Sequence, residues 1–243
     1  MKRDSNIDAF FALLRSGLWG NEVRLSEFGE IDFGEVYRLA EEQSAIGLVA
    51  AGLECVSDIK PAKKDVLQFI VRTIQMEQQN QAMNYFIGVL VDKMRKENIY
   101  TLLLKGQGIA QCYEKPLWRA CGDVDFFLSD DNYEKAKAYL IPLASDIEPE
   151  GEYKKHLGMT ISPWVVELHG NLRCGISTRV DKVLDEIRDD VFFRGNVRSW
   201  MDGETQVFLM SVNNDAIYLF THILGHFYKG GIGVRQICDW SRL

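Results

Sequence analysis

The spacing of apolar residues changes character near residue 99. Before it, apolar positions recur every three or four residues, which is the period of an amphipathic helix. After it, short apolar runs alternate with glycine, proline and polar turns, as in folds that mix strands with helices. We therefore predict an α+β protein with a helical N-terminal region over 1–98, a core with a small mixed β-sheet over 99–210, and a C-terminal helical region over 211–243.

The N-terminal pattern predicts three helices. The first covers 8–18. The second begins at Phe33 and runs towards Gly47, because the side chain of Asp32 is placed to accept hydrogen bonds from its first amides. The third covers about 62–98. Its predicted buried stripe consists of Leu67, Ile70, Ile74, Met83, Ile87, Leu90 and Met94.

Elements beyond residue 99 are predicted to be shorter. The predicted strands cover 99–104, 123–128, 155–161, 165–168 and 206–210, with a further strand-like patch over 191–193. The predicted helices cover 109–113, 131–140, 180–188 and 213–228, and another begins at Val234. This last helix stops in mid-pattern at Leu243, which fits either a missing C-terminal part or a frayed natural terminus.

Composition excludes several classes of protein. Of the 243 residues, 47% are apolar and 26% are charged, which is ordinary for a globular domain and excludes disorder as the main state. Acidic residues outnumber basic ones, 35 to 28, and the formal charge is −7. A long nucleic acid is therefore an unexpected partner, because binding it requires a cationic surface. A small anionic ligand at a locally basic site remains compatible with this charge.

Cysteine usage and hydropathy bear on the cellular compartment. The five cysteines are scattered and form no CxxC pair, which argues against a disulfide framework and against a structural zinc site. The N-terminus lacks an apolar signal-like segment, and no apolar run approaches the length of a membrane span. We therefore expect a cytoplasmic protein with no membrane partner.

Two aspartates two residues apart carry the strongest chemical signal. Alternate side chains of a strand share a face, so Asp123 and Asp125 point the same way, about 7 Å apart. Val124 and Phe126 then face the opposite side. Adjacent buried carboxylates repel each other, and Mg²⁺ resolves this because it prefers carboxylate oxygens together with substrate phosphates. The alternative is a surface strand with two solvated aspartates.

A glycine turn follows the first predicted strand of the core. Gly106 and Gly108 permit close approach of the backbone to a ligand, and Lys105 adds a positive charge. Six basic and three acidic residues lie between Val91 and Arg119, which favours a phosphate-bearing ligand. The alternative is an ordinary turn between a strand and a helix. The segment is neither a Walker A loop nor a complete Rossmann fingerprint.

A third acidic group lies in the predicted strand 165–168. If Val166 and Leu168 face the core, Glu167 and His169 share the opposite face. Glu167 then adds a third carboxylate to the aspartate pair, as in the two-metal sites of phosphoryl transfer. His169 either contacts a phosphate, or orients Glu167, or serves as a structural histidine.

Further candidates have weaker support. His222 and His226 share a helix face because they are four residues apart, and they either pack, contact substrate or bind zinc. The loop 229–233 either closes over a nucleotide or only links two helices. Trp118 either stacks on a base or packs as a half-buried tryptophan.

Several of these residues together resemble a known family. In chain order they are Lys105, Gly106, Tyr113, Pro116, Arg119, Gly122, Asp123, Asp125, Glu167, Leu168 and His169. The pattern resembles the uncharacterised nucleotidyltransferase family of the DNA polymerase beta-like superfamily. The resemblance covers about 99–170 and, more weakly, the helices around His222, Arg235 and Asp239. At Gln107 the superfamily usually has glycine or serine.

The resemblance implies a nucleotidyltransferase core that moves a nucleoside monophosphate from an NTP, such as ATP, to a small-molecule or protein acceptor, with Mg²⁺ or Mn²⁺. Asp123, Asp125 and Glu167 would be the metal carboxylates, and Gly106 with Gln107 the phosphate turn. We expect a carboxylate, first of all Glu167, or a metal-bound water to deprotonate the acceptor hydroxyl. The remaining residues predicted to contact the nucleotide are Lys105, Arg119, Gly122 and His169.

Two other functions use the same residues. The chain could be a non-catalytic module that binds a nucleotide or another protein. It could also be a two-metal phosphohydrolase or nuclease, because three carboxylates and two cations serve that chemistry equally well.

Overall fold

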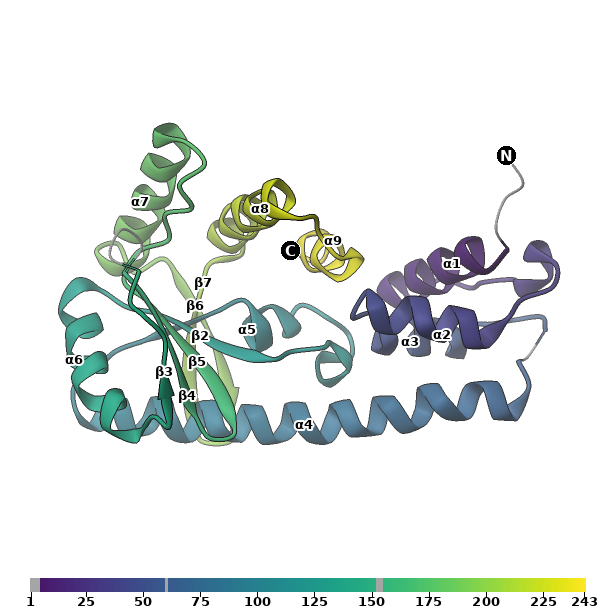
Figure 1. Cartoon of the computed structure of the whole chain (residues 1–243), viewed down its shortest axis with the longest axis horizontal. Coiled ribbons are helices and arrows are strands. Elements are labelled where there is room, and N and C mark those ends of the chain that lie inside the picture. Colours follow the sequence, from purple (N-terminus) through teal and green to yellow (C-terminus); the bar gives the residue numbers. More distant parts are fainter. Residues whose placement is uncertain (1–4, 60, 152–154) are drawn as a thin grey trace. The chain divides into compact units, whose positions relative to one another are not determined.

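The computed structural model describes residues 5–59, 61–151 and 155–243, which form helices and a seven-stranded mixed sheet (Figure 1). The predicted α+β class is confirmed. The residues group by their contacts into two compact units. The first contains the described residues up to Gln81, Tyr113–Ala120 and Gly233–Ser241, and the second contains Ala82–Cys112, Cys121–Ile232 and Arg242–Leu243. The predicted domain boundaries at residues 98 and 210 stay a prediction.

The first unit is helical. Its elements are α1 (Ser5–Trp19), α2 (Phe33–Glu42), α3 (Ile46–Glu54), the first half of α4 (Lys63–Lys96), α9 (Val234–Ser241) and the 3-10 turns η1 (Leu25–Phe28) and η2 (Pro116–Trp118). Asp32 caps α2 by accepting hydrogen bonds from the amides of Gly34 and Glu35, as predicted. The predicted continuation of this helix to Gly47 is wrong. The backbone of Ser44 turns to a φ of 53°, and the separate helix α3 follows.

The inward face of α4 differs from the prediction in its first half. The predicted positions Leu67, Ile70 and Ile74 are about half exposed, at 57%, 48% and 48%. Thr73 and Asn80 are buried instead, together with the apolar Phe69 and Met76. The two polar side chains tolerate burial because their donors are satisfied. Thr73 donates to a carbonyl of the same helix, and Asn80 donates to the carbonyls of Leu117 and Arg119. The rest of the stripe is buried as predicted, namely Met83, Ile87, Leu90 and Met94.

The second unit is built on the sheet, whose strand order is β3-β4-β5-β2-β1-β7-β6. The strands are β1 (Leu102–Leu104), β2 (Asp123–Phe127), β3 (Asp146–Ile147), β4 (His156–Ile161), β5 (Trp164–His169), β6 (Val197–Asp202) and β7 (Thr205–Met210). β2 pairs in parallel with β5, and β1 with β7, whereas the other pairs are antiparallel. The predicted strands 155–161 and 165–168 correspond to β4 and β5, which pair in an antiparallel hairpin.

Helices cover both faces of this sheet. One face packs on the second half of α4 and on α6 (Asp130–Leu140), and it buries Val124, Phe126, Val166 and Leu168. The other face packs on α7 (Thr178–Phe192) and α8 (Val212–Lys229), and it buries Phe127. Because side chains alternate along a strand, Asp123 and Asp125 lie on the face of α7 and α8. The predicted alternation along β2 and β5 is therefore confirmed.

Several local predictions need correction. The strand-like patch 191–193 lies at the end of α7, because the amphipathic helix period continues through Val191, which is buried. The short helix expected at 109–113 is α5 (Gly106–Ala110), which begins earlier at the glycine turn. The strands β3 and β6 were not predicted, because both are short or largely exposed and lack an apolar run.

Candidate functional site

Three carboxylates converge where β2 lies beside β5. Asp125 is paired directly with Glu167 in the register of the two strands, and Asp123 starts β2 on the same face. One carboxylate oxygen from each of Asp123, Asp125 and Glu167 lies within 4.8 Å of the others. The structure therefore brings together the three acidic residues that the sequence singled out.

Asp125 is the deepest member of this acidic cluster, with only 1% of its surface exposed. Its Oδ1 accepts from Lys105 Nζ and from His169 Nε2, each at 2.8 Å. Its Oδ2 is buried and has no hydrogen-bond partner among the described residues. Burial by itself would raise the pKa of Asp125, but the Lys105 ammonium and the hydrogen bond from His169 outweigh it and lower the pKa. Asp125 is therefore ionised and has one oxygen left for a ligand.

Asp123 differs electrostatically from its neighbour. Burial and the negative charge of Asp125 raise the pKa of Asp123, although Lys105 opposes them. No salt bridge is seen for Asp123 among the described residues. A positive charge bound beside this carboxylate would remove the repulsion between the two aspartates.

Lys105 reaches the cluster from an unusual backbone position. Its φ is 44°, in the left-handed region that residues other than glycine rarely adopt. Gly106 follows with a φ of 38°, and a Cβ at this position would lie 3.0 Å from Cys121 Sγ. Such strain persists where surrounding contacts fix it, commonly at functional sites. Here it turns Lys105 from the end of β1 towards Asp125.

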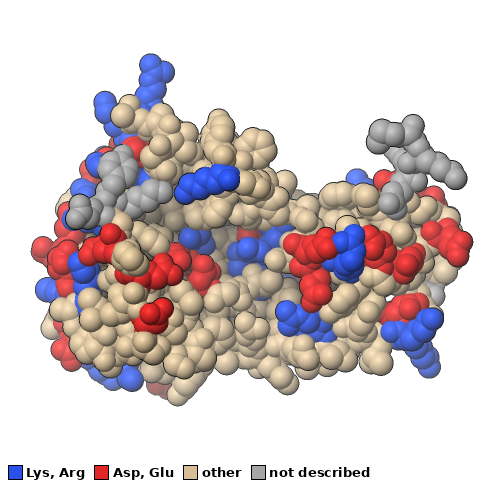
Figure 2. Space-filling model, viewed as in Figure 1, with Lys and Arg blue, Asp and Glu red and all other residues tan. Residues whose placement is uncertain are grey.

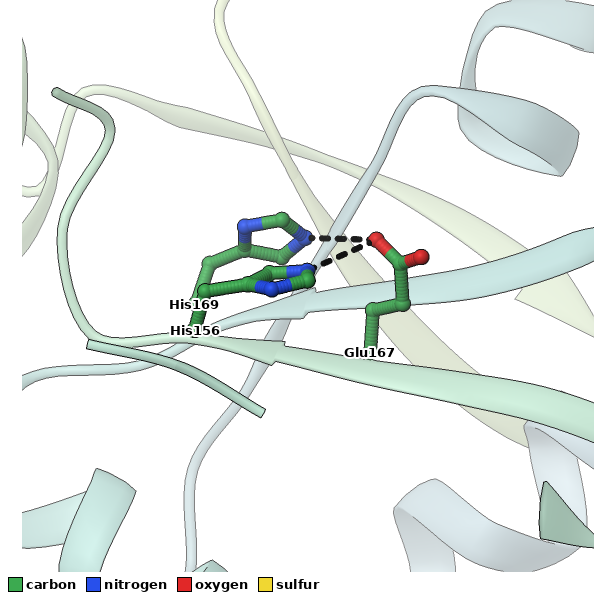
Figure 3. A group of neighbouring side chains, drawn as sticks. All are labelled: His156, Glu167 and His169. Carbon is green, nitrogen blue, oxygen red and sulfur yellow. Dashed lines mark hydrogen bonds and ion pairs between the residues drawn. The ribbon is translucent and has the colours of Figure 1, made fainter. Parts of the chain in front are cut away.

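Two histidines converge on Glu167 (Figure 3). His156 Nε2 lies 3.0 Å and His169 Nε2 lies 3.5 Å from the same oxygen, Glu167 Oε2. The hydrogen bonds from His156 and His169 lower the pKa of Glu167 well below its usual range. Burial would lower the pKa of His169, but its bonds to Asp125 and Glu167 raise it. Glu167 is therefore held as a carboxylate.

A cavity of about 400 Å³ opens onto this cluster. It lies on the face of the sheet covered by α8, and one of its walls is formed by α8 side chains. All four histidines of the chain line it. Its lining also includes Lys105, Asp123, Glu167, Asn171, Leu172, Arg173, Cys174, Tyr218, Thr221 and Lys229. This volume accommodates a small phosphorylated ligand.

The α8 histidines form a pair of their own. His222 Nε2 lies 3.0 Å from His226 Nε2, which confirms that they share a helix face. Burial and the nearby Lys105 lower the pKa of His222 to about 3, so its ring is neutral.

The structure places other predicted site residues outside this cavity. The side chain of Gln107 is buried in the core, and its amide nitrogen lies 3.7 Å from the sulfur of Met83. Gly122 is exposed just before β2. Arg119 belongs to the first unit, where its guanidinium donates two hydrogen bonds of 2.8 Å to the carboxylate of Asp239. The predictions that these residues bind the nucleotide stay predictions.

Trp118 is also bound within the first unit. Its indole nitrogen donates to Glu77 at 2.5 Å, and the Lys115 ammonium lies 3.7 Å from the centre of its ring. The ring thus has protein partners on its edge and on its face. Stacking of Trp118 on a base stays a prediction.

The sequence interpretation missed His156. Its position could have been derived from the hairpin, because the two-residue loop Ser162–Pro163 joins β4 to β5 and fixes their register. That register places His156 directly opposite His169. Counting outward from the loop is therefore the signal that would have found it.

The distribution of surface charge and the hydropathy of the helices concern nucleic acids and membranes as partners. On the face shown in Figure 2, acidic and basic side chains are interspersed, and the described residues form no broad cationic patch there. Among the described helices, none is both long and apolar enough to cross a membrane.

Similar proteins were found among solved structures and protein families. A solved structure, an antigenic nucleotidyltransferase-like protein from Paracoccidioides brasiliensis, is similar with a TM-score of 0.41 and 16% identity, over 65% of this chain and 73% of that one. No curated protein matches the sequence. The profile of the family described as uncharacterised nucleotidyltransferase matches residues 29–243, which include the whole acidic cluster and its cavity. The chain belongs to this family of uncharacterised nucleotidyltransferases.

Proposed function

We propose that the protein is a metal-dependent enzyme that transfers a nucleoside monophosphate from an NTP to the hydroxyl of a small-molecule or protein acceptor. The observation that supports this most is the convergence of Asp123, Asp125 and Glu167 within 4.8 Å, with Asp123 and Glu167 lining a cavity. Family membership supports the same reaction class.

The donor set fits Mg²⁺ or Mn²⁺. Both ions prefer carboxylate oxygens, and Mg²⁺ in proteins uses one or two carboxylates together with substrate phosphates. Oδ2 of Asp125 is buried without a hydrogen bond from the described residues, which is costly unless a ligand binds there. Asp123 and Glu167 supply the other oxygens. A cation held by these three residues would neutralise phosphate charge and polarise the reacting phosphoryl group.

The remaining residues of the cavity have roles that follow from their charge. Lys105 holds Asp125 in place from one side and stands at the cavity wall, where its ammonium attracts the triphosphate. Arg173 and Lys229 line the same cavity and add positive charge. His169 donates to Asp125 and fixes the orientation of its carboxylate.

The pKa of Glu167 bears on its role. An efficient proton acceptor has a pKa near the working pH, whereas the two histidines lower that of Glu167. We therefore propose Glu167 as a ligand of the cation rather than as the group that accepts the proton of the acceptor hydroxyl.

Binding of Mn²⁺ and ATP to variants tests the proposal. Electron paramagnetic resonance of free Mn²⁺ and calorimetry with ATP would be measured for the wild type, Asp125→Asn and Glu167→Gln. Asp146→Asn is the matched control, because Asp146 is an exposed aspartate of the edge strand β3. We expect the two site variants to lose Mn²⁺ and Mn²⁺-dependent ATP binding, and the control to keep both. Equal binding in all four proteins contradicts the proposal.

The product identifies the reaction. With ATP labelled at the α-phosphate and candidate acceptors, nucleotidyl transfer yields a labelled acceptor and pyrophosphate. Release of orthophosphate, or cutting of nucleic-acid strands, without labelled acceptor would instead identify a phosphohydrolase or nuclease. Binding of ATP without any product would identify a non-catalytic nucleotide-binding module.

A further inference from the structure

We infer that His156, Glu167 and His169 form a binding site for a divalent transition-metal ion, such as Zn²⁺ or Co²⁺, beside the acidic cluster. One donor atom from each of these three side chains lies within 4.8 Å of the others. This three-donor set shares Glu167 with the acidic cluster, but two of its three donors are imidazole nitrogens rather than carboxylate oxygens.

The donors are arranged by the backbone. His156 and His169 are directly opposite each other in the antiparallel pair of β4 and β5. Glu167 lies two residues before His169 on the same face of β5, and all three line the cavity. Figure 3 shows both imidazoles turned towards the carboxylate. Two paired strands therefore present a three-donor set on one face.

Two of the three separations between donor atoms are close to those around a single metal ion, and the third is within 4.8 Å. Two ligand atoms that each lie about 2.1 Å from an ion with tetrahedral or octahedral angles are about 3.0–3.4 Å apart. Glu167 Oε2 is 3.0 Å from His156 Nε2 and 3.5 Å from His169 Nε2. An ion bound here would replace these hydrogen bonds, and His169 Nε2 would release the proton that it donates to Asp125 Oδ1, which Lys105 still contacts.

The chemistry of the donors selects the class of ion. Imidazole nitrogen favours Zn²⁺, Co²⁺, Ni²⁺ and Fe²⁺, whereas Mg²⁺ and Ca²⁺ favour oxygen ligands. Two histidines and one glutamate leave coordination positions open for water or a ligand from the cavity. Glu167 belongs to both donor sets and would join the two sites.

The α8 pair is a weaker site. His222 and His226 also have nitrogens 3.0 Å apart, but they supply two donors. No third His, Cys, Asp or Glu atom of the described residues completes a group of three with them. These histidines are therefore the natural rival in an experiment, since adventitious metal binding would use them.

Histidine-resolved NMR of the full-length wild type tests the inference. The chain has four histidines, so an imidazole ¹H–¹⁵N correlation spectrum, with ¹⁵N label, has few signals to assign. On addition of one equivalent of Zn²⁺, we expect the Nε2 signals of His156 and His169 to shift to values typical of metal-bound nitrogen. Mg²⁺ at the same concentration should not do this. Shifts confined to His222 and His226, or no shifts, overturn the inference.

Variants test the same site by a second measurement. Visible absorption of Co²⁺ reports its coordination, and we expect His156→Gln to weaken Co²⁺ binding at least about 100-fold. Asp146→Asn should bind Co²⁺ within about 3-fold of the wild type, because Asp146 is an exposed residue of β3 outside the three-donor set. Circular dichroism shows whether His156→Gln folds. If His156→Gln does not fold, the histidine NMR spectrum of the wild type with Zn²⁺ tests the inference by itself.

The two proposals fail separately. Zn²⁺-dependent shifts of His156 and His169 without any nucleotide transfer would refute the proposed function and support this inference. Nucleotide transfer without those shifts would support the proposed function and refute this inference.

Discussion

Each compact unit buries a cluster of charged side chains, and the two clusters are built differently. In the first unit, both carboxylate oxygens of Asp239 accept from the guanidinium of Arg119, Tyr113 donates to Oδ1, and Arg235 lies 3.2 Å from Oδ2. In the second unit, the Lys105 ammonium contacts Asp125, and two histidines contact Asp125 and Glu167. Asp123 has no salt bridge and one oxygen of Asp125 has no partner among the described residues.

The difference separates structural charge from functional charge. A buried carboxylate surrounded by donors of its own unit is satisfied, so it needs no ligand. The repulsion within an excess of carboxylates at a cavity wall is relieved by a bound cation or by a proton. The contacts of Arg119 therefore favour a structural role in the first unit, whereas those of Asp123 and Asp125 favour ligand binding.

The largest expected effect is on turnover. Replacing Asp123 by Asn should lower Mg²⁺-dependent nucleotidyl transfer by about 10³-fold, because one of three cation ligands loses its charge. The measurement is the initial rate with ATP labelled at the α-phosphate. Asp146→Asn serves as the control, and a loss of less than about 3-fold in Asp123→Asn would show that this carboxylate holds no catalytic cation.

The next largest effect concerns the stability of the first cluster. Replacing Asp239 by Asn leaves the buried guanidinium of Arg119 without its charge partner, so the free energy of unfolding should fall by about 3 kcal/mol. Urea unfolding followed by circular dichroism measures it. A change below about 0.5 kcal/mol, the range of ordinary surface substitutions, would show that this cluster is not structural.

The difference in unfolding free energy between the wild type and Asp239→Asn should depend on pH in a definite direction. Burial would raise the pKa of Asp239, but Arg119 outweighs it and lowers the pKa below its unfolded value. A carboxylate of this kind stabilises the fold above its unfolded pKa and loses that contribution as the pH falls through its folded pKa. The gap in unfolding free energy between the wild type and Asp239→Asn should therefore narrow below about pH 4. A gap that widens on acidification contradicts this assignment.

A smaller effect is expected from the phenol of the same cluster. Tyr113 donates to Asp239 at 2.7 Å and is buried. Its replacement by Phe removes this hydrogen bond to a charged acceptor and should lower the free energy of unfolding by about 1.5 kcal/mol. The same urea series measures it. Equal stability of Tyr113→Phe and the wild type would mean that Arg119 and Arg235 satisfy Asp239 without the phenol.

The second cluster was predictable from local sequence and the first was not. Asp123, Asp125, Glu167 and His169 follow the two-residue period of strands, and burial of the intervening apolar residues fixes which way they face. The pairing of Arg119 with Asp239 spans 120 residues, and no local period specifies such a contact.

The buried face of α4 was also not fully predictable from local sequence. The stripe of Leu67, Ile70 and Ile74 satisfies the helix period, yet these residues are half exposed. Thr73 and Asn80 are buried instead, because each donates a hydrogen bond to a backbone carbonyl. Hydropathy records the apolar surface of a side chain and contains no information about such partners. His156 was missed for a different reason, since its register follows from the hairpin loop rather than from its own neighbours.

The most direct test of the difference between the two clusters is the unfolding free energy of the wild type and Asp123→Asn, measured in EDTA and in millimolar Mn²⁺. Ionised Asp123 opposes folding without a cation, because its folded pKa is raised by burial and by Asp125. We therefore predict that Asp123→Asn is more stable than the wild type in EDTA, by about 1 kcal/mol. We also predict that Mn²⁺ stabilises the wild type more than the variant, which keeps the donors His156, Glu167 and His169. Equal stabilisation of both proteins by Mn²⁺, or a less stable Asp123→Asn in EDTA, would contradict a cation site at these carboxylates.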